Sequence, residues 1–222
     1  MTKPSTSGER TEKKKAVRRN IVNAALNLCK DKGYSGVSLR EITREAGIAA
    51  PSFYNHFTDL EDLGLAIIDE AGLTLRQLLR RARKTVDQDE TIIQRSVDTF
   101  NRYLDANGEF FHFIVAERIG GIKPFKSAIE REISHIIEDV AESLEEEGRR
   151  KNRPIAYPVY VADLIVSCVF NAGATALHLS STKRRKYMEK TDIQVKMILF
   201  GAESLAARAI QKDLPIPDIE DK

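Results

Sequence analysis

The chain has 222 residues, of which 42% are hydrophobic and 31% charged, a composition typical of a globular protein and not of a disordered or collagen-like one. The length allows one large domain or two small ones. Charge is divided unevenly: residues 1–56 hold 11 Lys and Arg against 5 Asp and Glu, a net +6, whereas the remainder holds 24 against 28, a net −4. A basic front is typical of a protein that binds a polyanion.

A basic helix is predicted first, after ten small and polar residues that we expect to be unstructured. Helical periodicity begins at Thr11, with apolar residues recurring from Val17 to Leu28 on one face. The basic residues Lys13 to Arg19 lie mostly off that face, and Gly33 is expected to end the helix.

Two short helices are predicted next. Ser38 and Glu41 have the spacing of a capping box, so a helix is expected to begin at Ser38 and to stop at Gly47. A second short helix can begin near Pro51 and bury Phe53 and Phe57, leaving Pro51, Ser52, Tyr54 and Asn55 on its outer side. Two short helices joined by a glycine turn behind a basic helix outline a helix-turn-helix.

The rest of the chain is also expected to be helical. Asp59 can cap a long helix that reaches Lys84, and its tail from Arg76 holds five basic residues and no acid. Further helices are expected over 88–106, 109–118, 123–147, 157–180 and 186–211. The predicted fold class is all-α, with a three-helix head over residues 11–57 and a connecting helix plus larger helical domain over residues 58–212.

Two observations predict a cytoplasmic protein without a membrane partner. Cys29 and Cys168 lie in apolar helical patterns and lack the spacing of a metal or redox motif, so both are expected to be reduced core residues. No secretory signal opens the chain, and the most apolar run, residues 158–179, contains Asp163, which would be costly in a bilayer. A buried helix of a soluble protein is expected there.

Residues 20–65 resemble the TetR family of bacterial repressors. The motifs that carry the resemblance are Val37 to Ile42, Ala46-Gly47-Ile48 and the aromatic segment from Pro51 to Phe57. Within the family the chain looks most like regulators of unsaturated fatty acid biosynthesis and desaturation, and that similarity extends over most of residues 12–210. Many members carry a phosphate-binding lysine just inside the fourth helix, where this chain has Leu60.

The resemblance implies a set of DNA contacts in the head. It implies that Arg40, Ala50, Pro51 and Tyr54 face base edges and that Ser38, Ser52, Asn55 and His56 hold phosphates. Arginine can pair bidentately with guanine, and apolar side chains suit thymine methyls. His56 could instead be a core histidine, and the basic run from Lys13 could be either a phosphate-tracking arm or a solvated surface.

The resemblance also implies a homodimer that binds palindromic DNA and senses a fatty acyl-CoA or acyl-carrier thioester. The acyl chain would be lined by apolar residues that the sequence alone places only in the core: Phe110, Phe111, Phe113, Ile114, Phe125, Ile129, Val166 and Phe170. Its headgroup would need cations, for which Arg118, Arg149, Arg150 and Lys183 to Lys186 are candidates. Helices 157–180 and 186–211 would form the dimer seam.

Two other functions are weighed against this hypothesis. A drug-efflux regulator of the same family would sense a different apolar ligand. Two Glu-x-x-His pairs, Glu109/His112 and Glu132/His135, have the spacing seen in di-iron proteins, although only 23 residues separate them. No nucleophile elbow, phosphate loop or dinucleotide fingerprint is present, so no enzymatic activity and no cofactor or metal is expected.

Overall fold

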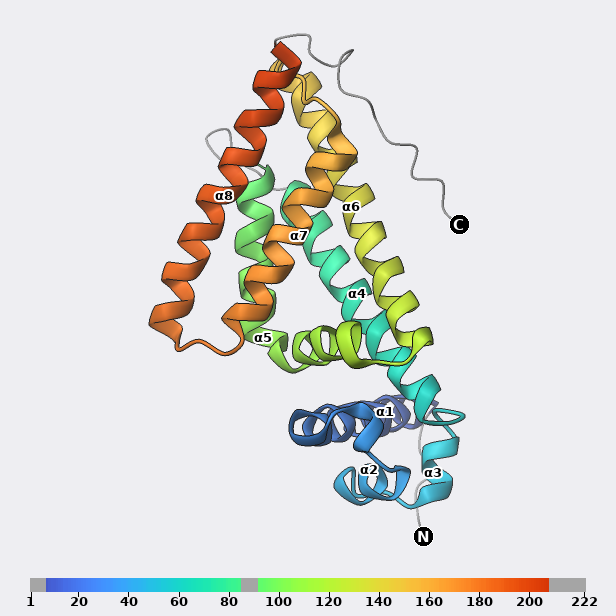
Figure 1. The fold of residues 1–222 in the computed structure, drawn as a ribbon. Helices are drawn as coiled ribbons and strands as arrows, with labels where there is room; N and C mark the ends of the chain where they lie inside the picture. Colours follow the sequence, from blue (N-terminus) through green and yellow to red (C-terminus); the bar gives the residue numbers. More distant parts are fainter. Residues whose placement is uncertain (1–6, 85–91, 208–222) are drawn as a thin grey trace. The chain divides into compact units, whose positions relative to one another are not determined.

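The computed structural model describes residues 7–84 and 92–207, and within these ranges the chain contains helices and no strand (Figure 1). The α-helices are α1 (Ser7–Lys32), α2 (Leu39–Glu45), α3 (Ala50–Tyr54), α4 (Leu60–Lys84), α5 (Ile92–Gly120), α6 (Lys123–Lys151), α7 (Pro158–Ala176) and α8 (Ser181–Ala207). A short 3-10 helix, η1 (Tyr34–Gly36), connects α1 to α2. The all-α prediction is confirmed.

The chain forms two compact units. Among the described residues, the first contains 7–74 and 107–132, and the second contains 75–84, 92–106 and 133–207. The division crosses the long helices α4, α5 and α6, whereas the expected domain boundary at residues 57 and 58 lies in the loop before α4; that boundary stays a prediction.

Local signals in the head act as the sequence predicts. Gly33 ends α1 with φ of 69°, and Gly47 lies between α2 and α3 with φ of 66°, a conformation in which a side chain would be strained. The capping box is complete: Ser38 accepts from the Glu41 amide, and Glu41 accepts from the Ser38 amide. Asp59 accepts from the Asp62 amide at 2.8 Å and caps α4.

Several predicted boundaries are wrong. Helix α1 begins at Ser7 and not at Thr11, and η1 was not foreseen. Helix α3 ends at Tyr54, three residues early. The helices expected at 88–106 and 109–118 form one helix, α5, because the break at Asn107 is only a local kink (φ −133°, ψ 31°). Helix α6 runs to Lys151, and α8 begins at Ser181; the expected residues 88–91 and 208–211 lie outside the described ranges.

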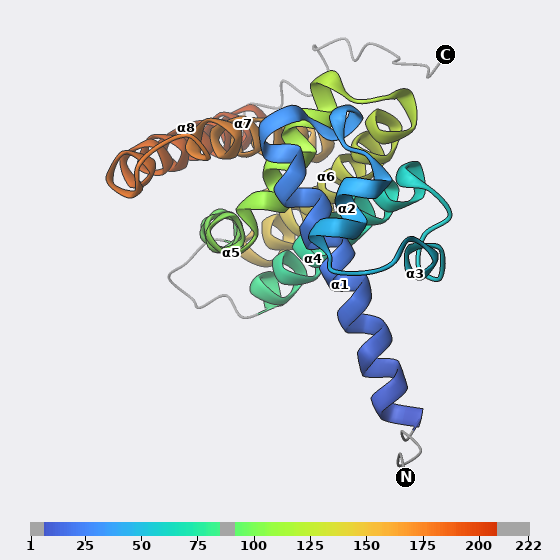
Figure 2. The same cartoon turned by 90° about the horizontal axis from the view of Figure 1, so that it is seen from below.

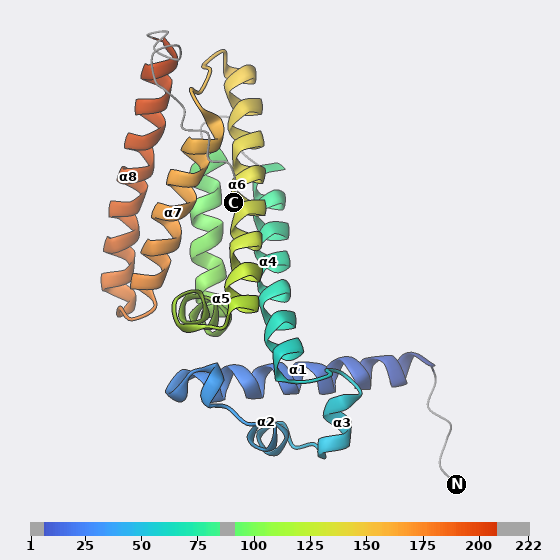
Figure 3. The same cartoon turned by 45° about the vertical axis from the view of Figure 1, so that its right-hand side comes forward.

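In the second unit, α7 and α8 lie side by side (Figures 1 and 3). Their facing sides are buried, with Ala162, Ile165, Ala172, Met188 and Val195 in one core cluster. The expectation that α7 is buried holds only for this side. Within the described residues α7 is the one helix long and apolar enough to span a membrane, and 39% of that stretch is buried.

Candidate DNA-binding interface

Helices α2 and α3 lie on one side of α1 in Figures 1 and 3, and the amino-terminal part of α1 extends past them (Figure 2). Ile42, Phe53 and Phe57 are buried at 0%, 0% and 3% exposure and pack the three helices together. This packing explains the short elements: five residues of α3 would not form a helix alone, and burial of Phe53 stabilises it.

The residues predicted to contact DNA lie on the outer side of this packing. Ser38, Arg40, Ala50, Pro51, Tyr54 and Asn55 are exposed, and Ser52 and His56 are half-buried. Tyr54 is 60% exposed, although it directly follows fully buried Phe53. A large aromatic side chain left in solvent by the fold is available for contact with a partner, and its predicted contact with base edges stays a prediction.

His56 lies beside basic residues of α1. Burial, followed by the charges of Lys14 and Arg18, lowers the pKa of His56 below its ordinary value. The lowered pKa favours the neutral imidazole in the chain without DNA. His56 is half-buried, and both roles that the sequence left open stay predictions.

Arg18 is held in place within the predicted basic arm. Its guanidinium lies 5.2 Å from the centroid of the Phe57 ring and donates to Glu70 at 2.7 Å. The cation–π contact and the ion pair tie α1 to the helix-turn-helix and to α4. Lys13 to Lys15 are exposed, which leaves the first part of the arm available to a phosphate backbone.

Ser38 has a structural role in the capping box. Its hydroxyl donates to Glu41 at 2.7 Å, and Lys32 pairs with the same carboxylate group at 2.6 Å. Hydrogen bonds from Lys32 and Ser38 lower the pKa of Glu41 to about 2. The box orients Arg40, which lies on the exposed side of the same helix.

Tyr34, which sequence reasoning did not single out, holds the head to α4, α5 and α6 within the first unit. Its hydroxyl donates to the Leu60 carbonyl oxygen, and its ring lies 5.3 Å and 5.4 Å from the Phe113 and Phe125 rings in edge contacts. Its backbone amide donates to the buried Glu117 carboxylate. Burial raises the pKa of Glu117. The position of an aromatic residue between two glycines, Gly33 and Gly36, was the sequence signal that could have pointed to the role of Tyr34.

A face on α7 and α8 is apolar and exposed. It comprises Val159, Tyr160 and Leu164 on α7 and Ile193, Met197 and Phe200 on α8. Met197 and Phe200 are 70% and 71% exposed. These residues lie on the two helices that the sequence analysis expects in the dimer seam, and Phe200 is three residues beyond Met197 on the same side of α8.

The residues expected to line an acyl channel are divided between the units. Phe111, Phe113, Phe125 and Ile129 are buried and Phe110 and Ile114 half-buried in the first unit, while Val166 and Phe170 are half-buried in the second. A groove of about 620 Å³ lies between α5 and α8, but other residues line it, and its wall mixes Val97, Met188 and Ile193 with charged side chains. The acyl channel stays a prediction.

The two Glu-x-x-His pairs take part in other contacts. Glu109 pairs with Lys30 at 2.5 Å, and His135 Nδ1 lies 2.8 Å from Arg76 Nη1. Over residues 7–84 and 92–207 no three His, Cys, Asp or Glu side chains come together as metal ligands. Cys29 is buried as expected, and burial raises its thiol pKa, but Cys168 is only half-buried.

The fold and this outward surface define a helix-turn-helix protein of the DNA-binding class. Residues 21–67 match the family described as bacterial regulatory proteins, tetR family, and residues 90–201 match the Tetracyclin repressor-like C-terminal domain. A transcriptional regulator of the helix-turn-helix type from Haemophilus influenzae is 41% identical over 202 residues, which cover 90% of this chain and 97% of that protein. The chain belongs to the TetR family of DNA-binding transcriptional regulators.

Two solved structures show the same fold. The reduced form of Escherichia coli NemR has a TM-score of 0.63 at 19% identity and covers 82% of this chain and 96% of its own. The fatty acid degradation regulator FadR from Bacillus halodurans has a TM-score of 0.66 at 15% identity and covers 82% of this chain and 94% of its own. Members of this family regulate transcription, which is not an enzymatic activity.

Proposed function

We propose that the protein is a cytoplasmic homodimeric repressor of fatty acid biosynthesis or desaturation genes, which binds a palindromic operator and responds to a fatty acyl thioester. The observation that carries the DNA-binding part is the exposure of Arg40 on α2 and of Pro51 and Tyr54 on α3, next to fully buried Phe53. Exposed side chains on the second helix of a helix-turn-helix are those that would enter a major groove, which supports the proposal.

The proposed base contact is tested with Arg40→Ala. The operator would first be selected from random duplexes by the purified protein, and affinity would then be measured by gel retardation at fixed salt. Because a bidentate arginine–guanine pair contributes about 1–3 kcal/mol, Arg40→Ala should weaken binding at one base position by that amount. Arg131→Ala, which removes an exposed arginine outside the head, is the matched control and should leave base preference unchanged.

Sequence-independent retardation would contradict the proposal. If random duplex competes for the protein as well as the selected operator does, the head binds DNA nonspecifically and is not the sequence-specific domain of a repressor.

The apolar face of α7 and α8 supports the homodimer. Its six large apolar side chains are exposed on two adjacent helices, and exposed apolar side chains gathered in this way mark a protein interface. A twofold pairing would bring both helices against the same helices of a second copy and form a four-helix seam. The same contact would cover the outer side of α7, where Val159, Tyr160 and Leu164 are otherwise left in solvent.

The acyl thioester is supported by the aromatic and aliphatic residues of α5 and α6. Burying an acyl chain among such residues yields about 0.8 kcal/mol per methylene. The FadR structure of similar fold is described as a fatty acid degradation regulator. The experiment is native mass spectrometry of the protein purified from its own cells: a bound acyl-CoA or acyl thioester supports the proposal, whereas a bound planar drug would make the protein an efflux regulator.

A further inference from the structure

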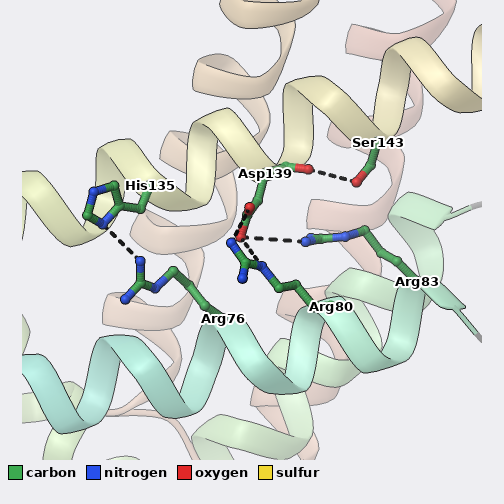
Figure 4. A network of polar contacts seen from close by, with 6 residues as sticks. All are labelled: Arg76, Arg80, Arg83, His135, Asp139 and Ser143. Carbon is green, nitrogen blue, oxygen red and sulfur yellow. Dashed lines mark hydrogen bonds and ion pairs between the residues drawn. The ribbon is translucent and has the colours of Figure 1, made fainter.

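The basic tail of α4 faces α6 within the second unit. Arg76, Arg80 and Arg83 follow one another at intervals of four and three residues, so they share one face of the helix. Figure 4 shows the three guanidinium groups reaching from α4 toward His135 and Asp139 on α6. Neither the DNA-binding head nor the apolar seam uses these residues.

One carboxylate is shared by two of the arginines. Arg80 holds Asp139 with two hydrogen bonds, Nε to Oδ2 at 2.9 Å and Nη2 to Oδ1 at 2.8 Å. Arg83 Nη2 lies 3.8 Å from Asp139 Oδ2, which is an ion pair but too long for a hydrogen bond. Arg76 donates instead to His135 Nδ1 at 2.8 Å. The carboxylate is therefore taken by Arg80.

Arg83 retains hydrogen-bonding capacity in a buried position. Its side chain is 9% exposed, and its buried Nη1 has no hydrogen-bond partner in the structure of the described residues. Burial lowers the pKa of Arg83. This direction is expected for a cation that has lost contact with water without gaining enough hydrogen bonds or opposite charge in exchange. A buried donor of this kind is costly unless an acceptor reaches it.

Among the described residues, positive charge exceeds negative charge around Arg83. Within that part of the chain the second acid that acts on Arg83 is Glu142, and its side chain lies on the exposed surface. Arg80 is 59% exposed, so solvent reaches the cluster at that residue. Arg80 binds Asp139 through Nε and Nη2, and its guanidinium group lies at the solvent side of Arg83.

We propose that Arg80 and Arg83 form a binding site for an oxyanion of the phosphate class. A planar guanidinium group can bind phosphate oxygens through two parallel hydrogen bonds, and a phosphate oxygen would supply the acceptor that Arg83 Nη1 lacks. Asp139 occupies the site in part and competes with the oxyanion for the same donors. This proposal does not depend on which effector the protein senses. The oxyanion is either free phosphate or the phosphate group of a larger ligand.

The test uses the full chain and inorganic pyrophosphate, with affinity measured by isothermal titration calorimetry at constant ionic strength. Asp139→Asn removes the competing charge, and we expect it to bind pyrophosphate about tenfold more tightly than the wild type. Arg83→Gln removes the guanidinium group with its buried Nη1 donor, and we expect this variant to bind pyrophosphate at least about tenfold more weakly than the wild type. The matched control is Asp105→Asn, which removes the carboxylate of the Arg184–Asp105 pair and should leave the affinity at the wild-type value.

The outcomes separate a site from a purely structural ion cluster. If Asp139→Asn loses stability with no gain in pyrophosphate affinity, or if Asp105→Asn gains as much, the proposal is overturned. If Arg83→Gln does not fold, Arg83→Lys keeps the charge but not the fork, and wild-type affinity in that variant would equally overturn it. Coenzyme A distinguishes the sources: tighter binding than pyrophosphate, lost in the Arg83 variants, assigns the site to a phosphate-bearing ligand, and equal binding assigns it to the free oxyanion.

Discussion

Gly64 on α4 lies directly against the Phe125 ring of α6 in the first unit. A Cβ atom on Gly64 would lie 2.2 Å from Phe125 Cζ and 2.8 Å from Cε1, distances that real contacts do not reach. Phe125 is 2% exposed and packs on Tyr34, so its ring cannot turn away without disturbing the aromatic cluster. A single methyl group at this position therefore tests how the head is anchored.

We predict that Gly64→Ala lowers the free energy of unfolding by about 1–3 kcal/mol, the usual cost of overpacking a filled core. Urea unfolding followed by circular dichroism measures the difference. Gly8→Ala is the matched control: it lies in α1 with no atom within 4 Å of the added methyl group, and it should be neutral or slightly stabilising. Equal effects of the two variants would show that Phe125 is not fixed by Tyr34.

Glu41 gives a pH dependence with a defined sign. Its pKa is lowered from 4.5 to about 2 in the folded protein by Lys32 and Ser38, so the ionised form is favoured by folding. This contribution to stability is complete above pH 4.5 and is lost as the pH falls from about 4.5 toward about 2. Glu41→Gln should therefore be less stable than the wild type at pH 7, and the gap should narrow through that window in urea titrations.

Ser38→Ala checks the same capping box from its other side. Loss of a serine N-cap costs about 1 kcal/mol, and the unfolding titration at pH 7 measures it. A gap between Glu41→Gln and the wild type that stays constant from pH 7 to pH 3 would contradict the assignment of the lowered pKa to this box.

At the scale of elements, the sequence was most informative where a local signal decides the backbone. The Ser38–Glu41 spacing, Gly47 and Asp59 each placed a helix end correctly, because capping depends on residues only three positions apart. The start of α1 and the continuity of α5 at Asn107 were missed. Polar residues and a glycine weaken helix propensity, which is why the sequence predicted a later start for α1 and a break in α5.

Helix α8 allows the proposed seam to be tested directly. Met197→Glu places a charge at a position that is 70% exposed in one copy, so the monomer should fold normally. In a homodimer the same charge would be buried in an apolar seam, where an unpaired carboxylate is strongly unfavourable. We expect sedimentation velocity to show monomers of the variant at concentrations where the wild type is a dimer.

The control for this substitution is Ile119→Glu. Ile119 is 78% exposed and lies near the end of α5, outside the face on α7 and α8, so the variant should remain dimeric. A wild-type protein that sediments as a monomer, or a Met197→Glu variant that remains dimeric, would remove the support for a seam on this face.

For the whole molecule, the sequence predicted the outward surface of the head better than it predicted the body. Alternation of buried Phe53 and Phe57 with polar neighbours determines which side of α3 faces solvent, and short-range periodicity records that alternation. For apolar residues such as Phe113 and Val166, the sequence does not distinguish a core position from the wall of a ligand pocket. Both positions need the same apolar side chains. Tyr34 was missed since its partners, Leu60 and Glu117, are far away in sequence.

The spacing of the two proposed heads gives the last prediction. A homodimer reading a palindrome must place its heads about 34–36 Å apart, one turn of B-DNA, or a multiple of that distance. Inserting five base pairs between the half-sites of the selected operator turns the second half-site to the opposite side of the duplex. We expect gel retardation to show the affinity falling to that of a single half-site, because a rigid dimer then reaches only one. A monomeric reader of tandem sites would be insensitive to the insertion, and Met197→Glu should reproduce that insensitivity by binding both operators equally weakly.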